Sequence, residues 1–243
     1  MTPVCRANLL AAAALFALFI CPPTQVVAAE ARVGSAEASL VLPVISGEPS
    51  LEDFAGMAPS TPLARSMSKV DGFVQRLPDD GDPASQQTEV YIGYDRTELH
   101  VIFLAFDSQP DQIRANLSSR ENIDGDDSVE MTIDTFNDQR AAFSFRSTPL
   151  GIQWDARWTE GNSMRAGFDT TLEAVWDSEG RLTDQGYMVK MAIPLRSLRF
   201  PDSSEQTWRI QFGRQIPRLS EEAYWPEYSL AIEGRLNQTA LWT

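Results

Sequence analysis

The sequence predicts an all-β protein, a two-sheet antiparallel β-sandwich of the immunoglobulin or jelly-roll type with short helical turns. From residue 88 onward, apolar and polar side chains alternate in short runs, which is the period of a half-buried strand. Glycine, proline and Asx turns separate most of these runs, and only short helical turns fit between them. Strands in this number without long helices are typical of a sandwich or a barrel.

The expected elements follow one another at short intervals. Strands are predicted at residues 88–94, 98–106, 128–134, 141–146, 151–158, 171–176, 187–193 and 208–214. Before them, residues 40–45 predict an edge strand that Pro43 interrupts, residues 55–69 a helix or a loose segment, and residues 77–83 a turn. Short helical turns are predicted at residues 110–114 and 194–198, and tight turns at residues 177–180 and 183–186.

Residues 128–146 predict a β-hairpin with one apolar and one polar face. Asn137 and Asp138 lie between its two runs, and side chains of this type favour turns. If the hairpin centres on Asp138, Glu130 and Arg146 face each other on the polar side. Two explanations remain open for this pair: a cross-strand salt bridge, or part of a recognition surface for a hydroxyl-rich ligand.

Residues 1–29 predict a secretory signal peptide. Arg6 gives a positive start, residues 9–20 are apolar and uncharged, and small residues precede Glu30. The apolar run is too short to cross a bilayer. Lipidation at Cys21 is disfavoured, because the bulky Ile20 precedes it. We therefore expect an exported protein, either periplasmic or associated with the cell surface or outer membrane.

Composition excludes several classes of function. Cleavage after Ala29 would remove both cysteines, and loss of Arg6 would change the net charge from −14 to −15. So acidic a domain repels nucleic acid, and we expect no nucleic-acid partner. His100, the one histidine, lies in an apolar run, which favours a packed strand residue over a catalytic base. With no cysteine beside it, structural zinc is excluded.

Three carboxylates, Asp124, Asp126 and Asp127, surround Gly125 just before a predicted strand. Oxygen ligands on a sharp turn suit calcium, so these residues form a candidate calcium site, although no cofactor is required. The spacing is not that of an EF-hand loop, and a solvated acidic loop is the more common arrangement.

Aromatic and arginine residues give further candidates. Trp154 and Trp158 share one face of a predicted strand, which favours packing in the core. Trp225 stands between Tyr224 and Pro226, in an expected loop, and is predicted to expose its ring. Arg214 would share the apolar face of its strand, so we expect a strand end or a bulge there.

No catalytic motif occurs in the sequence. There is no G-x-S-x-G, no phosphate-binding loop and no H-E-x-x-H. No spacing of acidic residues selects a glycosidase pair. The sequence therefore predicts a non-catalytic protein.

An ordered series of short motifs resembles a known family. It includes Gly125-Asp-Asp-Ser-Val-Glu130, Asp134-Thr-Phe-Asn-Asp138, Ile193-Pro-Leu-Arg-Ser-Leu-Arg-Phe-Pro201 and Gln206-Thr-Trp208. The series resembles family 9 carbohydrate-binding modules, which are β-sandwiches often attached to xylan-degrading enzymes. It is more similar still to the sandwich domain that precedes an outer-membrane-type barrel in exported bacterial proteins. The similar region covers residues 45–235.

The resemblance implies a role for particular residues. In the sugar-binding members, the positions of Glu130 and Arg146 contact the sugar, and two tryptophans clamp it. Asp124 stands at the position of one clamp tryptophan, and Trp225 is the candidate for the other aromatic. The implied function is an exported, non-catalytic module that binds a polysaccharide or oligosaccharide. The alternative is a structural or docking domain of an outer-membrane barrel system without a sugar site.

The same resemblance divides the chain. We expect a signal peptide at residues 1–29, a lead-in at 30–44, the carbohydrate-binding-like sandwich at 45–235 and a tail at 236–243. An outer-membrane barrel or an enzyme is the implied protein partner.

Overall fold

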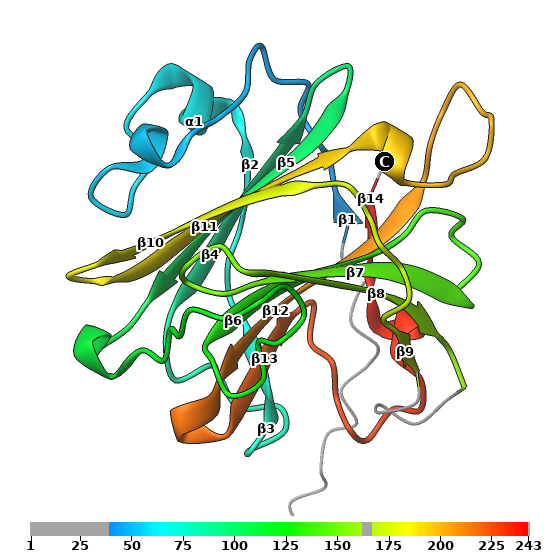
Figure 1. Ribbon diagram of the computed structural model, residues 1–243. Coiled ribbons are helices and arrows are strands. Elements are labelled where there is room, and N and C mark those ends of the chain that lie inside the picture. Colours follow the sequence, from blue (N-terminus) through cyan, green and yellow to red (C-terminus); the bar gives the residue numbers. More distant parts are fainter. Residues whose placement is uncertain (1–38, 162–166, 243) are drawn as a thin grey trace, which may run out of the picture. The chain divides into compact units, whose positions relative to one another are not determined.

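A computed structural model describes residues 39–161 and 167–242, and it confirms the predicted sandwich. Two sheets, here called sheet A and sheet B, pack face to face (Figure 1). In sheet A the path runs through β1 (Ser39–Leu40), β14 (Ala240–Trp242), β12 (Trp208–Ile216), β6 (Ser128–Asp134), β7 (Ala141–Ser147), β8 (Gln153–Thr159) and β9 (Phe168–Asp169). On this sheet β13 (Glu221–Trp225) also pairs with β12, and β3 (Val74–Leu77) pairs with β13.

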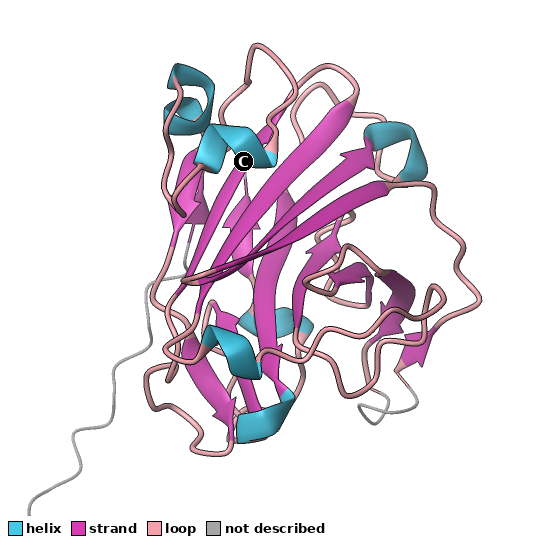
Figure 2. Ribbon diagram, turned by 60° about the vertical axis from the view of Figure 1, so that its left-hand side comes forward, coloured by secondary structure: helices cyan, strands magenta, loops and turns pink. Residues whose placement is uncertain are grey.

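Sheet B is formed by β10 (Asp177–Thr183), β11 (Gly186–Pro194), β5 (Glu98–Phe106), β4 (Thr88–Tyr94) and β2 (Ser68–Val70), in that order. Among the strands of residues 39–161 and 167–242, every pair is antiparallel except β1 with β14. The helical elements are short: α1 (Pro62–Ser66), η1 (Leu51–Phe54), η2 (Pro110–Gln112), η3 (Leu195–Ser197), η4 (Pro217–Leu219) and η5 (Leu236–Gln238). Figure 2 shows them in the connections between strands.

The main core lies between the sheets and follows the alternation in the sequence. On β6, Val129, Met131 and Ile133 are fully buried in this core. On β5, Val101 and Phe103 face them from sheet B. Each such side chain stabilises the fold by roughly 1.5–3 kcal/mol relative to leaving it in water. The intervening residues of β6, which are polar, therefore point to the outer face of sheet A.

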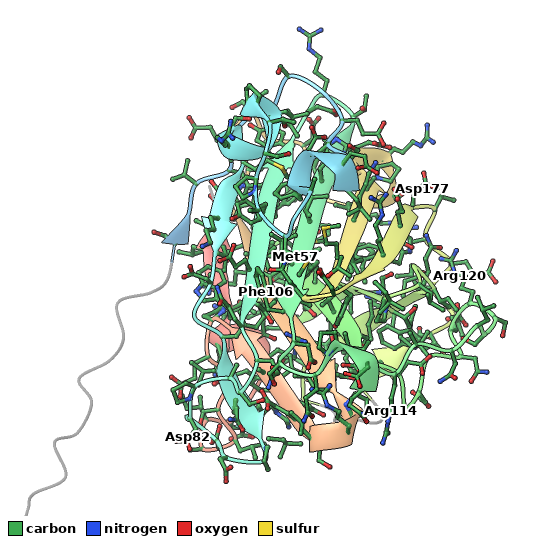
Figure 3. All side chains as sticks on the ribbon, turned by 90° about the vertical axis from the view of Figure 1, so that its left-hand side faces the viewer. Met57, Asp82, Phe106, Arg114, Arg120 and Asp177 are labelled. Atoms are coloured by element: carbon green, nitrogen blue, oxygen red, sulfur yellow. The ribbon has the colours of Figure 1, made fainter. Side chains whose placement is uncertain are left out.

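The outer face of sheet B is covered by the segment that contains η1 and α1. Leu51, Phe54 and Met57 are buried there against Ile102 and Leu104 of β5. Figure 3 shows Met57 on this side of sheet B, over β5. Coverage on this side explains why β5 is apolar on both faces, since neither face meets water.

His100 is a packed strand residue, as predicted. It is fully buried, and its Nε2 lies 3.2 Å from Oδ2 of Asp95.

Several elements differ from the sequence prediction. Residues 171–176 are not a strand, whereas the predicted turn at 177–180 belongs to β10, paired in regular register with β11. The apolar residues of 171–176 led to the error: Ala174 and Trp176 are buried in the core without belonging to a strand.

The bulge predicted at Arg214 is also wrong. The residue continues β12 in register and enters the core side fully buried. There its Nη1 donates to the carbonyl oxygens of Gln87 and Phe106. Its Nη2 also lies 3.5 Å from Oδ2 of Asp107, and this buried carboxylate together with the two carbonyl oxygens offsets the cost of burying the charge.

The ends of the sandwich extend beyond the predicted module limits of 45–235. β1 falls in the predicted lead-in and β14 in the predicted tail, and both belong to sheet A. The predicted signal peptide, its cleavage site and both cysteines lie outside the described residues. In the part of the chain that is described, no helix has the length and apolar character needed to span a membrane.

Candidate functional site

Glu130 and Arg146 form the pair that the hairpin register predicts. They stand opposite each other on β6 and β7, on the outer face of sheet A. Nη2 of Arg146 donates to Oε2 of Glu130 at 2.8 Å. The side chain of Arg146 is 13% exposed and that of Glu130 only 2%. The pair is thus a largely buried salt bridge at the floor of this face.

The other carboxylate oxygen of Glu130 is fully used by the protein. Oε1 accepts hydrogen bonds from Nη2 of Arg235 at 2.7 Å, Oγ of Ser144 at 2.7 Å and Oγ1 of Thr132 at 2.9 Å. Burial disfavours the charged carboxylate, but the guanidiniums of Arg235 and Arg146 outweigh it and hold the pKa of Glu130 well below its usual range. Glu130 is therefore an ionised, buried anchor.

Arg235 covers this anchor from the segment between β13 and β14. Its side chain is 1% exposed, and its Nε donates to Oε1 of Gln211 at 2.9 Å. Aromatic rings surround the guanidinium, with centroids 5.6–5.7 Å from Cζ: Trp158, Phe168, Tyr224 and Tyr228. We call these four residues the Arg235 cage. Cation–π attraction in such a dry site is stronger than at an exposed surface.

Backbone contacts hold Arg235 in the cage. Oε1 of Glu160 accepts from its backbone N–H at 2.7 Å, and Oε2 accepts from Leu236 and from Nε1 of Trp158. Because Glu160 ties the segment and the cage together, the position of Arg235 is fixed from both ends.

Trp154 extends the aromatic surface toward Arg146. The guanidinium carbon of Arg146 lies 4.7 Å from the Trp154 ring centroid, and Phe168 meets the same ring edge-on at 5.2 Å. Trp154 is half-buried on the outer face, so core packing, the prediction for this residue, is wrong. The faces of β8 are reversed because Asp155 pairs with Phe145 and points inward. There it accepts from the backbone N–H of Ala174 and from Nε1 of Trp176.

Trp225 does not join Glu130 and Arg146. It pairs with Phe212 on β12 and stacks on that ring, with centroids 6.2 Å apart. Phe212 belongs to the core between the sheets, so Trp225 lies on the opposite face of sheet A. The residue before it, Tyr224, takes the outer position. A strand at 221–225, in place of the expected loop, causes this exchange of faces.

A cavity of about 410 Å³ opens beside the Arg235 cage. Its lining includes Trp158 and Tyr228 of the cage, Arg235 itself, and Gln139, Glu233 and Asn237. The lining thus combines ring surface with amide, carboxylate and guanidinium groups. Such a lining can donate to and accept from a neutral polar ligand while covering an apolar face of it.

The candidate calcium ligands do not converge. Asp126 accepts from the backbone N–H and the amide of Asn116, and Asp127 accepts from the backbone N–H of Arg114 at 3.0 Å. Asp124 is exposed. Among the described residues, no group of three or more His, Cys, Asp or Glu side chains is placed to hold a metal ion. The structure therefore gives the calcium prediction no support.

Comparisons with known proteins show the fold. No family profile and no curated protein matches the chain. Among solved structures, a candidate carbohydrate-binding protein from Bacteroides uniformis has a TM-score of 0.62 at 13% identity, covering 85% of this chain and 99% of that one. A family 9 carbohydrate-binding module from Caldicellulosiruptor kristjanssonii, in complex with cellotriose, has a TM-score of 0.52 at 10% identity, covering 84% and 92%. The expected family 9-like fold is confirmed.

Sequence reasoning missed Arg235 and most of the cage. The shared face of Trp154 and Trp158 was the available signal, but it suggested the core. Arg235 lies 105 residues from Glu130 along the chain, in a segment without periodicity, and no local pattern connects the two.

Proposed function

We propose that this domain binds a saccharide without transforming it, on the outer face of sheet A in the cavity beside the Arg235 cage. The observation that carries the proposal is the combination of aromatic rings and fixed polar groups around this 410 Å³ cavity. Sugars present hydroxyls that need donors and acceptors, and C–H faces that pack on rings. Support comes from the fold shared with a module that was solved with cellotriose.

Glu130 and Arg146 act in this proposal through their positions. Glu130 is 1% exposed beneath Arg235 and Arg146, so it does not reach a sugar while Arg235 is in place. Its role is to hold the two arginines and, through Arg146, the Trp154 ring. The ligand then contacts Asn237 and Glu233, the exposed side chains of the lining, above the buried Tyr228.

The same geometry supports a non-catalytic role. A general acid must be protonated near the working pH, whereas two guanidiniums keep Glu130 ionised well below neutrality. Incubation with cello- and xylo-oligosaccharides should release no reducing ends.

Titration calorimetry and NMR with cello- and xylo-oligosaccharides test the binding proposal. We expect dissociation constants in the micromolar-to-millimolar range, roughly 4–8 kcal/mol of binding free energy. Asn237→Ala should weaken binding without unfolding the domain, because Asn237 is exposed. Asn122→Ala, at an exposed asparagine outside the cavity, is the matched control. Arg146→Ala should also lower affinity, by releasing Trp154.

A second candidate function is a docking domain of an outer-membrane barrel system. The buried carboxylate of Glu130 and the aspartate at position 124 favour it. One result distinguishes the two functions. If no oligosaccharide at millimolar concentration produces heat or a chemical-shift change, the docking function is favoured over saccharide binding.

We also propose export to the periplasm or the cell surface. It is supported by Arg6, the apolar run at 9–20 and the small residues 27–29. Mass spectrometry of the protein made in its own cells should find Glu30 at the mature N-terminus, and an intact Met1 would contradict export by this route.

A further inference from the structure

A second cavity, of about 690 Å³, lies on the core-facing side of sheet A. Phe143 of β7 and Arg157 of β8 stand opposite each other in its lining. Phe143 packs against the core between the sheets, so this side is opposite to that of Glu130. The first cavity and this one share none of their lining residues. The second cavity is therefore separate from the proposed saccharide site.

Three arginines line this cavity: Arg157, Arg196 of η3 and Arg199 just after it. All three are exposed, and none of their side chains makes a hydrogen bond or an ion pair to another described residue. By contrast, Arg146, Arg214 and Arg235 are each held by a carboxylate. Arg157 stands opposite Asp169 in the β8–β9 register and interacts with it electrostatically, whereas Arg196 and Arg199 have no such acidic partner among the described residues. Free guanidiniums at one place are notable in a chain whose net charge is −14.

Two acidic residues, Asp169 and Glu173, also line the cavity. The Asp169 carboxylate accepts from the backbone N–H and the hydroxyl of Thr171, at 3.0 and 2.7 Å. Three arginines and two acids leave the lining one charge positive. The formal charge of the lining thus has the opposite sign to the net charge of the chain, which favours an anion here over the rest of the surface.

The cavity also exposes apolar surface. Phe136 is 53% exposed and Val175 is 69% exposed, and both belong to the lining. Phe143 and Leu172 are half-buried beside them. A cavity of this size lies within the range of small-molecule sites, and a bare inorganic anion would leave its apolar wall in water. The surface fits a larger ligand that carries both an apolar face and a negative charge.

We propose that this cavity binds a carboxylate-bearing ligand with an apolar face. Guanidinium groups match carboxylates in planar, bidentate geometry, and the phenylalanines cover the apolar face. Two sources share this chemistry: a hexuronate oligosaccharide and an aromatic carboxylic acid. The inference does not depend on the proposed function, because the two sites use different residues.

NMR titration of the full chain tests the proposal with three probes: trigalacturonate, cinnamate and neutral cellotriose. We expect trigalacturonate or cinnamate to shift signals of residues 136, 143 and 175, and the shifts to shrink as salt rises. The double variant Arg196→Gln/Arg199→Gln should bind at least about tenfold more weakly, since each charged hydrogen bond is worth roughly that factor.

Arg114→Gln is the matched control. Arg114 is an exposed arginine outside the cavity whose side chain is likewise unpaired among the described residues, and Figure 3 shows it at the margin of the sandwich. The Arg114→Gln variant should bind the anionic probes as tightly as the wild type does. Binding of either anionic probe that is lost in the double variant and kept in the control supports the site, and the stronger probe identifies the source.

Two outcomes would overturn the inference. One is that neither anionic probe perturbs these residues at millimolar concentration. The other is that cellotriose binds at them as tightly as trigalacturonate, with no effect of the double variant. Loss of cellotriose binding in Asn237→Ala concerns only the first cavity, so failure of one proposal is distinguishable from failure of the other.

Discussion

Arg235 and Glu130 form a buried ion pair whose stability depends on both partners. Taking a guanidinium out of water costs several kcal/mol, and Glu130 together with the aromatic rings of the cage offsets that cost. Removal of either partner leaves the other buried and uncompensated.

Glu130→Gln should therefore lower stability in a pH-dependent way. The folded-state pKa of Glu130 lies below its unfolded value, so its ionised form stabilises the fold at neutral pH. That contribution is fully present above pH 4.5 and is lost as pH falls through the folded-state pKa. At pH 7 the variant should be less stable by roughly 3 kcal/mol.

Thermal unfolding of both proteins between pH 2.5 and pH 7, roughly two units either side of the ordinary pKa, checks this prediction. The melting temperatures should converge as the solution becomes more acidic. Other carboxylates, such as Asp95, titrate equally in both proteins and cancel in the difference. A difference that stays constant over the whole range would show that Glu130 does not act through its charge.

At this scale the sequence predicts the pair but not its surroundings. Two strands of known period and one turn determine the register of Glu130 and Arg146. The position of Arg235 depends on the path of a long connection, and the face that Trp225 occupies depends on whether residues 221–225 form a strand. The register of Glu130 and Arg146 follows from local sequence, whereas the positions of Arg235 and Trp225 depend on tertiary packing.

Among the elements, the segment with η1 and α1 covers a face of sheet B that would otherwise be exposed apolar surface. Phe54 is fully buried there, with its ring 4.9 Å from that of Tyr91. Phe54→Ala should cost about 3–5 kcal/mol, as is usual for truncating a buried aromatic ring. Leu117→Ala, at a side chain that is 90% exposed, should cost less than about 0.5 kcal/mol. Urea unfolding measures both, and equal midpoints would show that this layer is not part of the cooperative core.

The acidic loop before β6 allows a direct test for calcium. We expect millimolar calcium to leave the melting temperature unchanged, because Asp126 and Asp127 already accept hydrogen bonds from the protein. An ion bound at a hundred times its dissociation constant would add about 2.7 kcal/mol. A rise of several degrees in the melting temperature that a chelator reverses would therefore support a calcium site at residues 124–127.

Strand prediction succeeds where alternation is regular and fails where burial comes from a loop. β4, β5 and β6 have the predicted bounds, because each alternates cleanly or is apolar throughout. Residues 171–176 carry apolar side chains into the core without pairing, whereas β10 is a polar edge strand that resembles a turn in composition. Apolar content reports burial, and only the ladder of hydrogen bonds defines a strand.

For the whole molecule, the resemblance places the module at residues 45–235, whereas the sandwich uses residues on both sides of these limits. β14 pairs with residues 208–210 of β12, and β1 pairs with β14. The Trp242 ring lies 4.7 Å from Trp208 and 6.4 Å from Tyr94, and so connects the two sheets. The resemblance follows short motifs, and residues 240–242 carry none of them.

A chain that ends at Arg235 should consequently be much less stable than the full chain. Its loss of β14 leaves part of β12 as an unpaired edge, which favours aggregation, and removes η5 and the Leu236 contact that hold Arg235 in its cage. Trp242→Ala in the full chain isolates the packing term, roughly 3 kcal/mol, because it keeps the strand. We expect the truncation to lower the midpoint of urea unfolding beyond this variant and to abolish oligosaccharide binding. Equal midpoints for the truncated and full chains would instead mean that sheet A is complete without its last strand, and that Arg235 holds its position without η5 and β14.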